Sequence, residues 1–135
     1  MNTENGGAID ALIERFYGEF DNRTGRAPSA AALRSLFAAD ARITRVSSAE
    51  IERWTVDEFI APRIALLTRG PLTRFHEWEV RSNTTVFDAI AHRESHYRKT
   101  GMMNGAPYDG AGRKFIQLYR RDASWLISSV LWEDD

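Results

Sequence analysis

Residues 92–96, His-Arg-Glu-Ser-His, hold two of the chain's three histidines with a glutamate between them. On a helix, His92 and His96 would lie one turn apart and could share a metal ion. On a strand, His92, Glu94 and His96 would alternate onto one face, where imidazole beside carboxylate suits proton transfer near neutral pH. A solvated strand face without chemistry is the third interpretation. The surrounding elements decide among them.

The second half of the chain favours strands. After Gly70-Pro71, four runs rich in aromatic and β-branched residues (72–82, 84–99, 112–122 and 124–134) are separated by clusters typical of turns. An antiparallel meander is the economical interpretation, so residues 92–96 belong to a strand. Their order differs from the zinc-protease spacing, and the remaining histidine, His76, lies in another run. We therefore expect no metal site.

The first half favours helices. Residues 8–20 place Ile9, Leu12, Ile13, Phe16 and Phe20 on one helical face. A second helix starts after the cap Ser29, and a short strand follows at 41–46. Thr55 and Glu58 form a capping box for a third helix, which Pro62 should kink or split. The sequence thus predicts an α+β domain, with three N-terminal helices packed on a strongly curved, mostly antiparallel sheet.

Composition limits the function. The chain has 135 residues and ordinary proportions of hydrophobic (43%) and charged (27%) residues, which fits one domain over residues 1–135 with its core at 8–133. A net charge of −1 argues against a nucleic-acid partner. There is no cysteine, no signal-like N-terminus and no long apolar run, so we expect a cytoplasmic protein that does not cross a membrane. The glycine loop at 110–115 has Phe115 where a nucleotide loop needs glycine, and we expect no cofactor.

Three segments carry a family resemblance: 36–43 (LFAADARI), 89–101 (AIAHRESHYRKTG) and the closing hairpin 112–134 with its Trp-x-Ile-x-Ser. They resemble the nuclear transport factor 2 superfamily, which includes ketosteroid isomerases, SnoaL-like cyclases and scytalone dehydratases. The resemblance implies a cone-shaped fold, an internal pocket between helices and concave sheet, and a homodimer formed through the outer sheet face. It does not identify an activity, because one fold hosts many functions.

Steroid isomerisation fits the chain poorly. Phe16 stands where the resemblance would put the catalytic tyrosine, Arg45 where it would put the aspartate base, and Phe115 near the position of the acid. Phenylalanine cannot donate a hydrogen bond to an oxyanion, and a guanidinium that stays protonated cannot act as a base.

A register counted from Trp132 predicts the pocket. It points His92, Glu94 and His96 inward, whereas a slip of one residue would point Ala91, Arg93, Ser95 and Tyr97 inward instead. The predicted lining residues are Phe16, Phe20, Phe59, His76, Trp78, Ile90, His96, Phe115, Gln117, Val130 and Trp132.

Two functions remain open. In the first, the pocket binds a small molecule with an apolar body and an anionic or carbonyl group, and the protein is a cofactor-independent lyase or isomerase. His92 or His96 would then act as general base oriented by Glu94, with Arg45 holding an anionic intermediate. In the second, the domain is a non-catalytic binding or dimerisation module.

Overall fold

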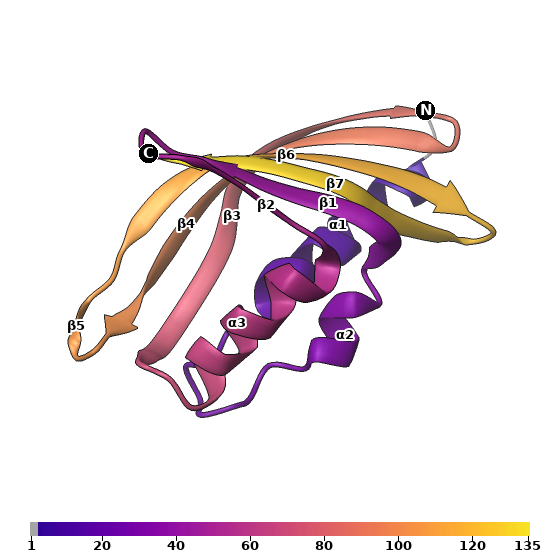
Figure 1. The fold of residues 1–135 in the computed structure, drawn as a ribbon. Helices are drawn as coiled ribbons and strands as arrows, with labels where there is room; N and C mark the ends of the chain where they lie inside the picture. Colours follow the sequence, from indigo (N-terminus) through magenta and orange to yellow (C-terminus); the bar gives the residue numbers. More distant parts are fainter. Residues whose placement is uncertain (1–2) are drawn as a thin grey trace.

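The computed structural model describes residues 3–135, and its three helices lie on one face of a bent sheet (Figure 1). The helices are α1 (Thr3–Gly18), α2 (Ala30–Arg34) and α3 (Val56–Thr68). The strands are β1 (Phe37–Val46), β2 (Ile51–Trp54), β3 (Leu72–Phe87), β4 (Ile90–Met103), β5 (Ala106–Pro107), β6 (Gly110–Arg121) and β7 (Ser124–Asp134). None of these helices has both the length and the apolar character needed to cross a membrane.

The sheet is mostly antiparallel. Its strand order is β2-β1-β7-β6-β4-β3, with β5 paired to β4, and only the β1–β7 pair is parallel. Long strands β3, β4, β6 and β7 form the predicted meander and curve over the helices (Figure 1). The predicted α+β class, with helices on one face of a curved sheet, is confirmed.

Several predicted boundaries are wrong. Residues 82–84 do not form a turn, because β3 continues through them and Asn83 pairs with Glu94 across the ladder. The chain reverses at Asp88-Ala89 instead, where Asp88 adopts a positive φ of 49°. Strand β1 begins at Phe37 rather than residue 41. Pro62 does not split the third helix, because α3 runs from Val56 to Thr68 as one helix.

The helix-capping predictions are confirmed. The Ser29 side chain accepts a hydrogen bond from the Ala32 amide, and Thr55 and Glu58 form a complete capping box. The predicted apolar face of α1 is buried as well, and each of its members is at most 4% exposed: Ile9, Leu12, Ile13, Phe16 and Phe20. The buried face of α1 sets how this helix packs on the sheet, and the caps set where α2 and α3 begin.

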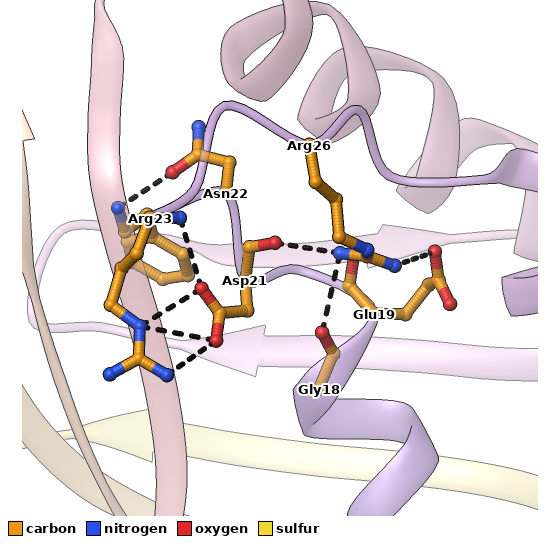
Figure 2. A network of polar contacts seen from close by, with 7 residues as sticks. Gly18, Glu19, Asp21, Asn22, Arg23 and Arg26 are labelled. Atoms are coloured by element: carbon orange, nitrogen blue, oxygen red, sulfur yellow. Dashed lines mark hydrogen bonds and ion pairs between the residues drawn. The ribbon is translucent and has the colours of Figure 1, made fainter.

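The α1–α2 connection is tied to the rest of the fold by Asn22 (Figure 2). The buried Asn22 side chain accepts a hydrogen bond from the Phe75 amide at 2.7 Å and donates to the carbonyls of Leu67 and Leu72 at 2.9 and 3.0 Å. Arg26 donates to the carbonyls of Glu19 and Asp21, which follow the end of α1 and lie beside it in Figure 2. Asn22 therefore joins α1, α3 and β3 at one end of the domain.

Candidate functional site

A cavity of about 390 Å³ lies between the helices and the concave sheet. One part of its wall is aromatic and comes from Phe16, Phe20, Trp54, Phe59, Phe75, Tyr108 and Trp132. The other part is charged and comes from Arg45, Glu52, Arg63, Glu77, Lys99, Lys114 and Asp134. A cavity of this size, in which an apolar wall meets convergent polar groups, is typical of small-molecule sites.

Lys114 is the most deeply buried charge of this wall. Strand β6 turns it inward because its cross-strand partner in β7 is Trp132, which also faces the cavity. Its side chain is 5% exposed, and Nζ lies 2.9 Å from Oε2 of Glu77. Burial lowers the pKa of the Lys114 ammonium, while the nearby Glu77 carboxylate opposes that shift.

The ammonium of Lys114 also lies over an aromatic ring. Its Nζ is 3.4 Å from the centroid of Tyr97 and 4.9 Å from that of Tyr17. A cation over the face of a ring is stabilised by the ring quadrupole. Carboxylate and rings together explain how a lysine can remain on the inner face of the sheet.

The Tyr97 hydroxyl belongs to a second group of acidic and basic side chains. Its hydroxyl donates a hydrogen bond to Oδ1 of Asp134, and Lys99 Nζ lies 3.5 Å from the same oxygen. Burial and then the bond to Asp134 raise the pKa of Tyr97, so the phenol stays protonated. Gly112 makes room for this arrangement, since a Cβ there would collide with the Tyr97 hydroxyl.

Arg63 stands among three rings at another part of the wall. Its Cζ lies 4.1 Å from the ring centroid of Phe59, 4.9 Å from Trp54 and 5.6 Å from Trp132. One of its nitrogens donates to the Phe59 carbonyl at 3.0 Å. Burial lowers the pKa of Arg63 to about 10, which leaves it protonated at neutral pH.

A further polar network lies under α1, outside the cavity wall. Arg93 donates to both oxygens of Glu79, at 2.5 and 3.1 Å, and to Asp10 at 2.5 Å. Ser95 donates to Glu79 at 2.6 Å and its hydroxyl also meets that of Tyr17 at 2.7 Å. Burial raises the pKa of Tyr17. This closed network joins α1 to β3 and β4.

The predicted inward register of β4 is wrong, and the alternative that slips by one residue matches the structure. Ala91, Arg93, Ser95 and Tyr97 are all buried, at 8%, 3%, 0% and 1% exposure. The expected inward residues of β4 and β6 lie on the outer face of the sheet instead: Ile90, His92, Glu94, His96, Phe115 and Gln117. Residues next to one another in a strand point to opposite faces, so a single shift reverses the whole set.

The outer stretch 92–96 is held by local contacts. His96 Nε2 lies 2.7 Å from Oε2 of Glu94, and Arg113 lies 3.6 Å from the same oxygen. The hydrogen bond to His96 lowers the pKa of the Glu94 carboxyl. His92 stacks on Phe115 with ring centroids 5.8 Å apart. Among residues 3–135, no group of three histidine or acidic side chains is placed to hold a metal ion.

The other predicted lining residues divide in two. Phe16, Phe20, Arg45, Phe59 and Trp132 line the cavity. Val130 is buried in the core without lining it, and His76 and Trp78 stack on each other 4.7 Å apart, away from it. The residues that sequence reasoning missed are the charged groups of the cavity wall: Glu52, Arg63, Glu77, Lys99, Lys114 and Asp134.

Comparisons with known proteins define the fold. No protein-family model matches the sequence, and no curated protein matches it. Solved structures do match, with a TM-score of 0.83 and 14% identity for a conserved protein from Planctomyces limnophilus DSM 3776, over 99% of this chain and 98% of that one. A nuclear transport factor 2-like protein from Salmonella enterica serovar Typhimurium LT2 matches at 0.73 and 14%, over 92% and 86%.

An enzyme of the same fold is also similar. Hexachlorocyclohexane dehydrochlorinase LinA-type3 from Novosphingobium barchaimii LL02 matches with a TM-score of 0.75 and 16% identity, over 98% of this chain and 88% of that one. The chain therefore has the nuclear transport factor 2-like fold, as its sequence resemblance implied. At these identities the likeness defines the fold and leaves the activity to the site.

Proposed function

We propose that the cavity binds a small molecule with an apolar body and a carbonyl or acidic oxygen, and that this oxygen faces Lys114. The observation that carries the proposal is a buried ammonium paired with Glu77 on the wall of a cavity whose other part is aromatic. Rings on both sides would enclose the apolar body, and a cation in a low-dielectric site binds an oxyanion strongly.

The same pair can move a proton. The Glu77 carboxylate takes a proton from carbon next to the bound carbonyl, the C–H electron pair forms an enolate, and Lys114 holds the negative oxygen. Return of the proton to another carbon is an isomerisation, and departure of a β-substituent with its electron pair is an elimination. The dehydrochlorinase of the same fold is named for an elimination. Lys114 and Glu77 thus replace His92 and Glu94 in the proposed chemistry.

Binding is tested by filling the cavity. Leu66 lines it, so Leu66→Trp should abolish the calorimetric heat and thermal shift given by aromatic acids and ketones that bind the parent protein. Ala61→Trp, at an exposed position of α3, the helix that carries Leu66, is the control and should bind as before, because Ala61 does not line the cavity. Equal binding by both variants would place the ligand elsewhere.

Proton transfer is tested in heavy water. A bound ketone should take up deuterium at the carbon next to its carbonyl, followed by NMR, faster than it does in buffer. Glu77→Gln should remove this exchange and keep binding, because the amide fills the same space but cannot accept the proton. Exchange that survives the substitution would exclude Glu77 as the base.

A non-catalytic binding module is the second candidate, and one observation favours it. Every fully buried side-chain nitrogen and oxygen among the described residues has a hydrogen-bond partner, and the proposed base and cation, Glu77 and Lys114, are bonded to each other. This alternative predicts ligand binding without any deuterium exchange, and the experiment above therefore separates the two.

We also propose that the domain forms a homodimer through its outer sheet face. Phe115 and Leu131 are cross-strand partners at the middle of that face, and they are 37% and 45% exposed. A sheet covered by helices on one side leaves such residues to be covered by a second copy. Light scattering should give twice the mass of the 15.4 kDa chain, and Leu131→Glu should give the monomer. A monomeric parent protein would contradict the proposal.

A further inference from the structure

The cavity wall has four basic residues and three acidic ones, so one basic residue is left over when they pair. Three acids line it, and each has a basic neighbour that also lines it. Glu77 meets Lys114 at 2.9 Å, while Asp134 meets Lys99 at 3.5 Å. Glu52 meets Arg45 at 3.7 Å. Arg63 is the remaining cation, and within the part of the chain that the structure describes no carboxylate lies within ion-pair distance of it, although Glu77 and Glu52 act on it from further away.

The guanidinium of Arg63 is also prepared for an anion. Its contacts are three aromatic rings and one carbonyl, which account for a single one of its five N–H donors. The rings hold the planar group in place and shield part of it from water, and both effects strengthen a charge-assisted hydrogen bond. The geometry of guanidinium favours a planar two-oxygen acceptor, which is a carboxylate.

We infer that Arg63 is the anchor for a carboxylate, so that the small molecule bound in the cavity is an aromatic or alicyclic carboxylic acid. This inference rests on the proposed function of the cavity and names its substrate class. Arg63 and Lys114 lie against the same indole, at 5.6 and 5.9 Å from the centroid of Trp132. One ligand packed on Trp132 can therefore place its carboxylate at Arg63 and a second oxygen toward Lys114, as an oxo acid would.

The test uses matched pairs of neutral and anionic probes. Benzoate, phenylacetate, indole-3-acetate and phenylpyruvate are titrated by calorimetry beside their primary amides, which have nearly the same shape and no charge. The parent protein should bind the acids about tenfold or more tightly than the amides, as expected for a charge-assisted pair in a dry site. Arg63→Gln should remove this preference and leave amide binding within about twofold.

Two variants complete the design. Arg63→Lys keeps the charge without the two-pronged donor and should keep part of the preference. Arg69→Gln, an exposed arginine just after the same helix, is the control and should keep all of it. Thermal unfolding of each variant checks the fold, and if Arg63→Gln does not fold, the acid-to-amide ratio of the parent protein and of Arg63→Lys decides the matter.

Each outcome has one meaning. Equal binding of acids and amides by the parent protein overturns the carboxylate inference and leaves the small-molecule pocket standing. A preference for acids that persists in Arg63→Gln assigns the anchor to another cation and also overturns it. If no acid and no amide binds, the proposed function fails and the inference fails with it.

Discussion

The two faces of β4 carry similar numbers of polar side chains and put them to different uses. The outer face presents His92, Glu94 and His96 to solvent or to local partners. The inner face buries Arg93, Ser95 and Tyr97, each of which is hydrogen-bonded to an acid from another strand. The histidines and glutamate of residues 92–96, which suggest catalysis in the sequence, therefore make only local contacts. The alternate residues of the same strand, Arg93, Ser95 and Tyr97, join β4 to other strands of the sheet.

The largest expected effect comes from the inner face. Arg93→Met removes the hydrogen bonds to Glu79 and leaves a carboxylate that is 19% exposed without its cation. Loss of one member of a buried pair is strongly destabilising, so we expect the free energy of unfolding to fall by about 2–4 kcal/mol. Arg113→Met removes a half-exposed arginine 3.6 Å from Glu94 on the outer face and should cost less than about 1 kcal/mol. Urea unfolding measures the free energy of unfolding of both variants. Similar losses would show that the two faces of β4 contribute equally to stability.

The next largest effect is a loss of folding stability at alkaline pH. The pKa of Tyr97 and that of Tyr17 are both raised by burial, so above pH 10 the unfolded chain loses protons that the folded chain keeps. This contribution to stability is fully present below the unfolded tyrosine pKa of about 10 and falls above it, by at most about 1.4 kcal/mol per pH unit for each tyrosine. The lowered pKa of Lys114 acts with the opposite sign, raising stability with pH until about 10.4, where unfolded lysine titrates.

Urea unfolding at about pH 9 and about pH 11 separates these contributions. The parent protein should lose stability between the two conditions, and Tyr97→Phe should lose clearly less, because one of the two groups is gone. An equal loss of unfolding free energy between the two pH values for both proteins would show that Tyr97 keeps no proton that the unfolded chain releases.

The smallest effect belongs to the outer face. His92→Ala and His96→Ala should each change the free energy of unfolding by less than about 0.5 kcal/mol, the usual range for surface positions. His92 loses one stacked ring, Phe115, and His96 loses one hydrogen bond to Glu94. A loss above about 2 kcal/mol for either would mean that this stretch supports the fold.

The sequence predicted the helices, their caps and the α+β class because those features are local. It did not predict the register, and one residue explains why. Leu118 pairs with Ile127, but Gln117 pairs with Ser129, so Ser128 is an extra residue in β7. If the residues of β6 and β7 are paired without this bulge, Phe115 lies opposite Val130 and therefore on the inner face of the sheet. The error carries over to β4, because Glu94 pairs with Phe115 and takes the same face.

A signal of the bulge is present in the sequence. The buried apolar residues of β7 change parity, from Trp125 and Ile127 to Val130 and Trp132, across Ser128-Ser129. The sequence does not indicate that Lys114 and Arg93 are buried. Charged residues are rarely buried, and the same strands also carry exposed arginines, such as Arg98 and Arg113. Glu77 and Glu79, the partners of Lys114 and Arg93, come from β3, far away in sequence, so only the fold brings the pairs together.

The most direct test of the account compares the two faces in one binding experiment. An aromatic oxo acid such as phenylpyruvate is titrated by calorimetry into the parent protein, Lys114→Met and His92→Ala. We predict that Lys114→Met loses at least about tenfold in affinity and that His92→Ala stays within about twofold. The double substitution Glu77→Leu with Lys114→Met, which leaves no unpaired charge, should bind as weakly as the single one if it is the ammonium that matters. Unchanged affinity in Lys114→Met together with a tenfold loss in His92→Ala would contradict the account and return the site to the outer stretch 92–96.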